Sequence, residues 1–143
     1  MAIVIPDGIL TNATSQYVRD WIIEHFRILA VVSLPQHTFS HVKAGVKSSV
    51  LFLKKHPKEL TQKFKQTLVN IKFTVRNEKL DKDQRTERMT ELYKEAIFNY
   101  SKDYELLMLE VENVGYDATG KNIEGSELDE VAQLVRDFIN QNK

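Results

Sequence analysis

Two short apolar runs constrain the fold more than any other feature of this 143-residue chain. Residues 2–5 (AIVI) and 28–34 (ILAVVSL) are each followed at once by a proline. Unbroken apolar runs of this length are typical of strands buried on both faces of a parallel sheet. Between them, residues 15–26 repeat apolar positions at helical spacing. The sequence therefore predicts a βαβ unit whose two strands are parallel and whose crossover is right-handed.

A third apolar run at residues 49–55 predicts one more strand. The loop at 36–47 has no helical pattern, so we expect this strand to return antiparallel beside one of the first two. The turn-forming residues Pro6, Asp7 and Gly8 predict a turn where the first strand ends.

The second half of the chain reads mainly as helices. Apolar stripes predict two helices within residues 57–100, joined by a charged, exposed linker at 76–85. Residues 106–111 predict a fourth strand, and 115–120 predict a turn. A final amphipathic helix is expected at 127–140. Its inward residues would be Leu128, Val131, Leu134, Val135 and Phe138.

These elements suggest three segments. Residues 1–56 hold the first three strands, 57–103 form a helical insertion, and 104–143 supply a strand, a turn and the terminal helix. Three strands with one crossover helix leave an apolar face and a long edge uncovered. Since a strand at residue 2 is an unusual beginning, we expect the natural protein to supply more strands before Met1. The uncovered edge would favour a homodimer of the isolated chain.

Composition excludes several classes of protein. The chain has no cysteine, which removes disulfides, thiolate metal sites and a cysteine nucleophile and fits a cytoplasmic location. No apolar run is long enough for a membrane span, and no basic stretch precedes the first strand as in a signal peptide. The sequence contains neither a nucleophile-elbow serine nor a Walker loop, so hydrolase and NTPase functions are unsupported.

The net charge of zero hides an asymmetry along the chain. Residues 1–56 carry six Lys/Arg against three Asp/Glu, and 57–103 carry eleven against eight. Residues 104–143 carry only three against nine. A mildly basic body with an acidic tail is not by itself a nucleic-acid-binding surface. Any contact with DNA would need residues from outside this chain.

Four stretches taken together carry a resemblance to a known family. They are AIVIPDGIL at 2–10, YVRDWIIEHF at 17–26, LAVVSLPQHTF at 29–39 and VKSSVLFLKK at 46–55. They resemble the last third of N-6 adenine DNA methyltransferases, and more narrowly the modification subunit of type I restriction-modification systems. The stretch VENVGYDATG at 111–120 resembles a segment that often follows the catalytic core.

The resemblance implies an α/β fold, namely the C-terminal part of a Rossmann-like S-adenosylmethionine-dependent methyltransferase sheet followed by helices. The three strands would be the fifth, sixth and seventh, with the last antiparallel and inserted between its neighbours. The parent enzyme would methylate the N6 of adenine in duplex DNA and assemble with specificity and restriction subunits. This chain would be a fragment contributing the target-base side of the active site.

The cofactor-binding and catalytic motifs of that family are absent. The sequence contains no Gly-x-Gly and no Asn-Pro-Pro. We therefore expect no catalytic residue and no cofactor-binding residue in this chain, and neither methylation nor S-adenosylmethionine binding by the chain alone. The alternative is a non-catalytic interaction module whose helices within 57–100 and 127–140 dock a partner subunit.

The resemblance also nominates a target-base pocket. An extruded adenine needs an aromatic or apolar surface to replace its lost stacking, and Phe39 is the one aromatic residue in the loop at 36–47. The alternative is that Phe39 only anchors the loop on the core. Pro6, Asp7 and Gly8 would shape the neighbouring wall. Without the resemblance, these three residues would simply form a turn.

Basic residues of the same loop are candidates for phosphate contacts. Lys43, Lys47 and His37 could meet DNA, although solvated loop charge is the commoner explanation. His37 and His41 are four residues apart, as metal ligands on a helix can be, but the segment lacks a helical pattern and a third ligand. We therefore expect no metal site here.

Overall fold

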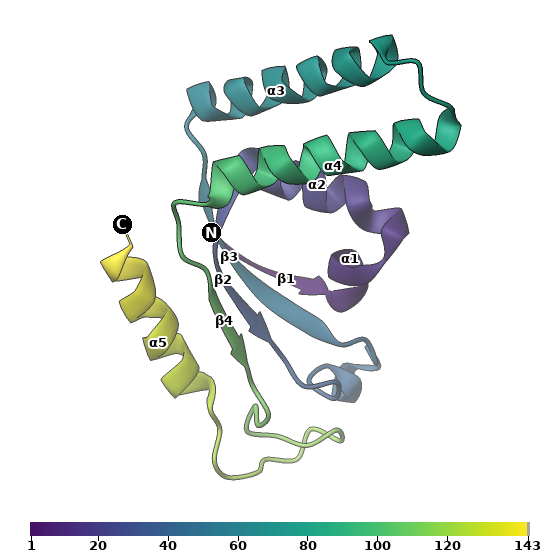
Figure 1. Cartoon of the computed structure of the whole chain (residues 1–143). Coiled ribbons are helices and arrows are strands. Elements are labelled where there is room, and N and C mark those ends of the chain that lie inside the picture. The colour runs from purple at the N-terminus through teal and green to yellow at the C-terminus, as the bar shows by residue number, and fades with distance from the viewer. Residues whose placement is uncertain (143) are drawn as a thin grey trace. The chain divides into compact units, whose positions relative to one another are not determined.

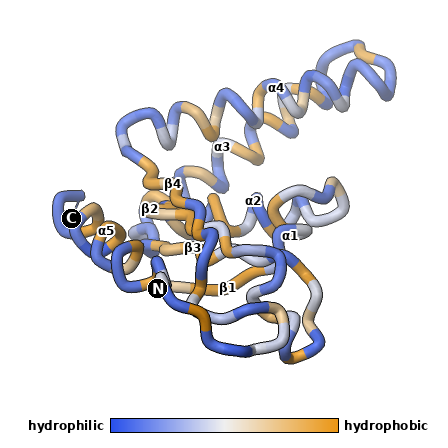
Figure 2. Tube along the Cα trace, turned by 90° about the horizontal axis from the view of Figure 1, so that it is seen from below, coloured by the Kyte–Doolittle hydropathy of each residue, from blue (hydrophilic) through white to orange (hydrophobic). Residues whose placement is uncertain are grey.

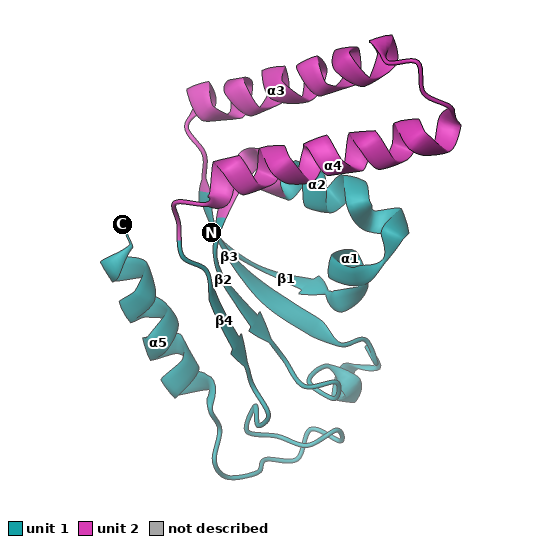
Figure 3. Cartoon of the chain, in the orientation of Figure 1, with its two compact units in different colours: residues 1–22, 28–54, 105–143 teal, residues 23–27, 55–104 magenta. Residues whose placement is uncertain are grey.

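The computed structural model describes residues 1–142, and these form two compact units (Figure 3). The first unit comprises the described residues of 1–22, 28–54 and 105–143. The second comprises residues 23–27 and 55–104. No helix among the described residues is long and apolar enough to cross a membrane.

A four-stranded mixed sheet organises the first unit (Figure 1). Its strands are β1 (Ala2–Pro6), β2 (Phe26–Ser33), β3 (Ser48–Lys55) and β4 (Leu107–Glu110), in the order β1-β3-β2-β4. The strand β3 runs antiparallel to β1, and β4 runs parallel to β2. The predicted antiparallel third strand and the predicted fourth strand are confirmed. The third strand lies between the first two, so β1 and β2 are not neighbours.

The predicted burial of the first strand is wrong. In β1 only Ile5 is buried, whereas Ile3 is 42% exposed and Val4 is 51% exposed. The reason is position, because β1 is the outermost strand of the sheet and pairs on one side only, with β3. An apolar run signals burial only when the elements on both sides of it are present.

The segment after β1 is helical and not the predicted turn. Pro6 has φ −61° and ψ 138° and precedes the short helix α1 (Asp7–Thr11). Proline fixes φ near the value needed before a helix, and an acidic Asp7 in the first turn suits the helix dipole. The 3-10 turn η1 (Ala13–Ser15) and the helix α2 (Gln16–His25) follow. The crossover helix predicted for residues 15–26 is confirmed.

The core of the first unit lies between the sheet and the helix α5 (Leu128–Gln141). Figure 2 shows that the strands are among the most hydrophobic segments of the chain. The buried cluster comprises Ala30, Val32, Leu34, Val111, Val114 and Val135. The helix contributes Val131, Val135 and Ile139, which share one face at i, i+4 and i+8. Leu128 and Leu134 are largely exposed, so their predicted inward position is wrong.

The second unit is built on a helical hairpin. The helices α3 (Lys58–Asn77) and α4 (Lys82–Ser101) pack through Phe64, whose ring centroid lies 4.7 Å from that of Tyr100. The predicted linker at 76–85 shrinks to residues 78–81. It is short because Asp81 caps α4 in a capping box with Gln84.

Candidate functional site

The candidate site lies at the edge of the sheet where β1, β2 and β4 end. Pro6 at the end of β1 pairs with Ser48 at the start of β3. Leu34, directly after β2, donates its N–H to the carbonyl oxygen of Ser48 at 3.0 Å. Ser33 pairs with Glu110 at the end of β4. In open α/β sheets this carboxyl edge is where ligands bind.

Asp7 is fixed at this edge by two hydrogen bonds. Its backbone N–H donates to the carbonyl oxygen of Lys47 at 2.9 Å, and its Oδ1 accepts from the Oγ of Ser49 at 2.7 Å. Ser49 is buried, and a bond between a hydroxyl and a carboxylate is stronger than one between neutral groups. Pro6 and Asp7 therefore adjoin the end of the loop at 36–47.

The loop at 36–47 holds its shape through its own backbone. The carbonyl oxygen of Phe39 accepts from the N–H groups of Val42 and Ala44, at 3.2 and 3.1 Å. A single 3-10 turn, η2 (Ser40–Val42), lies within it. Lys43 ends that turn with φ 63°, a left-handed conformation that costs a non-glycine residue about 1–2 kcal/mol.

Phe39 packs against the core cluster of the sheet and α5, yet it is only partly buried. Its position is compatible with both interpretations of the sequence, a loop anchor and a surface for an extruded base. The two interpretations are not exclusive, because a ring anchored on one side holds its other parts in a defined position.

The basic residues of the loop lie in different surroundings. The Nζ of Lys47 lies 3.4 Å from the Oε1 of Glu110, so part of its charge is balanced within the chain. Lys43 is exposed and His37 is partly buried. His41 packs edge-on against Tyr116, with ring centroids 5.1 Å apart. No cluster of three or more metal-ligating side chains occurs among residues 1–142.

The connection between β4 and α5 is ordered by two carboxylates that the sequence analysis did not single out. Glu127 accepts the backbone N–H groups of Asn113 and Glu112, at 3.0 and 2.7 Å, and these bonds lower its pKa. Asp117 accepts from the hydroxyl and N–H of Thr119 and from the N–H of Lys121, which lowers its pKa as well. The Asp-x-Thr-Gly spacing at 117–120 was the available indication of a turn stabilised by its aspartate.

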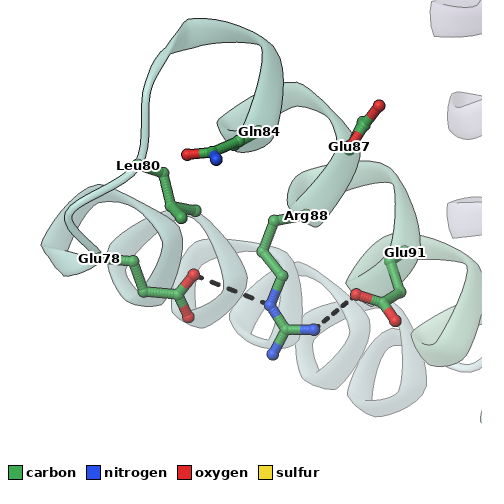
Figure 4. A pocket seen from close by; sticks show the side chains of 6 residues that line it. All are labelled: Glu78, Leu80, Gln84, Glu87, Arg88 and Glu91. Atoms are coloured by element: carbon green, nitrogen blue, oxygen red, sulfur yellow. Dashed lines mark hydrogen bonds and ion pairs between the residues drawn. The ribbon is translucent and has the colours of Figure 1, made fainter.

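A pocket of about 540 Å³ lies at the α3–α4 connection of the second unit (Figure 4). Arg88 extends between two carboxylates there, with Nη1 2.6 Å from Glu91 and Nε 3.7 Å from Glu78. The hydrogen bond to Glu91 raises the pKa of Arg88. The guanidinium is therefore engaged by the chain itself. None of the site residues predicted from the sequence lines this pocket.

A match to the N-6 DNA Methylase family covers residues 1–133. The chain belongs to this family. The match is wider than the stretches that carried the resemblance, because it includes the helical region between residues 57 and 100. No curated protein sequence matches the chain.

The mixed α/β architecture can be compared with the fold of the N-6 DNA methylase family. The family is one of adenine-specific DNA methyltransferases, which use S-adenosylmethionine and have a Rossmann-like fold. The four-stranded sheet with helices agrees with this fold class. The substrate of this family is DNA.

The lowered pKa of Glu127 makes the β4–α5 connection sensitive to acid. A carboxylate whose pKa is lower in the folded chain stabilises it above the unfolded pKa, and the contribution is lost as pH falls through the folded pKa. We expect the stability of the chain to fall below about pH 4–5, and Glu127→Gln to make that fall shallower.

Chemical denaturation at several pH values measures the effect, with amide shifts of Glu112 and Asn113 as a local reporter. The exposed Glu124→Gln is the matched control. Equal pH dependence in the wild type and in Glu127→Gln would show that these hydrogen bonds do not stabilise the chain.

Proposed function

We propose that this chain is part of a site-specific adenine-N6 DNA methyltransferase of a type I restriction-modification system. It would contribute the target-base side of the active site and contacts to other subunits. The strand order β1-β3-β2 carries the proposal, since an antiparallel strand between two others is the arrangement expected of the last three strands of such a sheet. By this reading β1, β2 and β3 are the fifth, sixth and seventh strands.

The exposed edge of β1 supports a partial sheet. Ile3 and Val4 lie on the outermost strand and are about half exposed. Apolar side chains on an unpaired edge strand favour pairing with a further strand. In a complete methyltransferase sheet that neighbour would be the preceding parallel strand.

Phe39 would receive the target adenine. A methyltransferase must rotate its target base out of the duplex, at a cost of a few kcal/mol of lost stacking and pairing. An aromatic ring at the carboxyl edge of the sheet offsets part of that cost. Pro6, Asp7 and Gly8 would form the adjacent wall, and Lys43, Lys47 and His37 would contact phosphates.

The methyl donor would be held elsewhere. The sequence has no Gly-x-Gly loop for S-adenosylmethionine and no Asn-Pro-Pro motif to accept hydrogens from the adenine amino group. The residues present therefore do not fit a cofactor site, and we assign no step of methyl transfer to them. This chain's role is to orient the base and exclude water from it.

Calorimetric titration of the purified chain with S-adenosylmethionine should show no binding, because the residues that would hold the cofactor are absent. A family member with an intact glycine-rich loop serves as the positive control. Stoichiometric binding at micromolar concentrations of cofactor would contradict the proposal.

In the complete methyltransferase, Phe39→Ala should weaken productive binding of the target base by about 1–3 kcal/mol, roughly 5- to 150-fold, because base stacking is lost. Phe52→Ala is the matched control, since Phe52 packs partly buried on the same core.

Phe39→Leu separates stacking from packing, because leucine keeps most of the apolar volume but has no ring. Fluorescence of a base analogue at the target position reports extrusion directly. If Phe39→Leu extrudes and methylates the base like the wild type, Phe39 is a loop anchor only.

The second candidate is a non-catalytic module that docks a partner subunit. The observation in its favour is the outer face of α3, where Val69 is 57% exposed and Phe73 is 68% exposed. Lys72 and Arg76 flank them, and α3 carries five Lys/Arg against one Glu. An apolar surface framed by positive charge suits an amphipathic helix with acidic margins.

The coding sequence separates the two candidates. An open reading frame that continues upstream, with Asn-Pro-Pro-Phe or Asn-Pro-Pro-Tyr before this region, is expected for part of a methyltransferase. A stop codon followed by a ribosome-binding site at Met1 would instead favour the docking module.

A further inference from the structure

The loop that holds Phe39 is contacted by the segment that follows β4. His41 lies in η2, two residues after Phe39, and its ring meets the ring of Tyr116 at an interplanar angle of 79°. A Cβ atom built on Gly120 would lie 3.2 Å from the Cβ of His41. The turn at Gly120 therefore lies against His41 as well as the ring of Tyr116.

The contacting segment is itself stiff. Gly115 and Gly120 adopt φ values of +88° and +86°, which L side chains rarely allow. The N–H of Ile123 donates to the carbonyl oxygen of Gly115 at 3.0 Å, and Asp117 accepts three hydrogen bonds inside the turn. Tyr116 also packs against the core cluster. Packing against the core therefore holds the ring of Tyr116 in place independently of its contact with His41.

The turn η2 of the loop is supported mainly by backbone bonds within the loop itself. The carbonyl oxygen of Lys47 at the end of the loop accepts from the N–H of Asp7, whereas the N–H groups of Val42, Lys43 and Ala44 all donate to neighbours in the same loop. Lys43 holds a left-handed conformation, which stores strain in that turn. A strained turn persists only where surrounding contacts determine it, and His41 on Tyr116 is such a contact.

We propose that Tyr116 is a positioning residue for the loop at 36–47, which holds Phe39. Acting through His41, it holds η2 in place and so fixes the ring of Phe39 two residues earlier. The use of Phe39 for an extruded adenine rests on the proposed function, whereas the ordering of the loop by Tyr116 does not. The segment at 111–120 would thus help to position the loop that holds Phe39.

Hydrogen exchange of the purified full chain, followed by NMR, tests the proposal without DNA. Edge-to-face aromatic pairs contribute enough that Tyr116→Ala should speed exchange of the Val42, Lys43 and Ala44 amides roughly two- to tenfold. The ring protons of His41 should shift as the ring current of Tyr116 is lost. Tyr116→Phe keeps the ring, so its amide exchange and its His41 shifts should match those of the wild type.

Two further variants guard the interpretation. His41→Ala removes the other half of the contact from an exposed position, so it should speed the same amides even if Tyr116→Ala disturbs the core. Tyr17→Ala, at a residue 74% exposed, is the control and should change nothing in the loop. Wild-type exchange in both Tyr116→Ala and His41→Ala would overturn the proposal, as would identical behaviour of Tyr116→Phe and Tyr116→Ala.

Failure of the proposed function would be seen separately. Loop exchange that depends on Tyr116, together with unimpaired methylation by Phe39→Leu, would leave the positioning contact in place and remove the base-stacking role. Loop exchange independent of Tyr116 would remove the positioning role and leave the base-stacking role to the variants of Phe39.

Discussion

Backbone pairing of β3 with both of its neighbours is the interaction on which the rest of the first unit depends. Because β3 starts at Ser48 beside Pro6 and Leu34, it brings the ends of β1 and β2 to one edge. The same strand presents Ser49 to Asp7. A shift of β3 by one residue would turn Ser49 and every other side chain of the strand to the opposite face. The candidate site therefore depends on strand register as well as on its own residues.

Much of the fold could be predicted from local pattern, and most of the errors concern which side chains are buried. The apolar runs gave the strands, and the periodic stripes gave the helices. The exposure of Ile3 and Val4, the helix at Asp7 and the outward position of Leu134 could not be predicted in this way. The two exposures are decided by which element lies next to the segment, and local pattern holds no record of that neighbour. The helix at Asp7 was missed for a local reason, because Pro, Asp and Gly suit a turn as well as a helix start.

The candidate site likewise has residues that the sequence could nominate and contacts that it could not. Phe39 and Asp7 were nominated through resemblance, together with the expectation that strand ends meet. The hydrogen bond from Ser49 to Asp7 joins residues 42 positions apart, and the contact of His41 with Tyr116 joins residues still further apart. Neither pair shares a motif or a periodic pattern. Carboxylates that bind backbone N–H groups, such as Glu127, are equally hidden, because any exposed glutamate on a polar stretch looks the same in sequence.

The parallel pairing of β2 with β4 has a consequence for how the chain folds. Ala30 pairs with Leu107, so closing this part of the sheet encloses 76 residues. Contacts of such long range are formed late, because the entropy of closing the loop is lost before the contact is gained. The α3–α4 hairpin, in contrast, is built from local contacts and forms on the microsecond scale of helices. Once folded, the hairpin replaces much of this span by two helices, so fewer flexible residues separate β2 from β4 when the two strands pair.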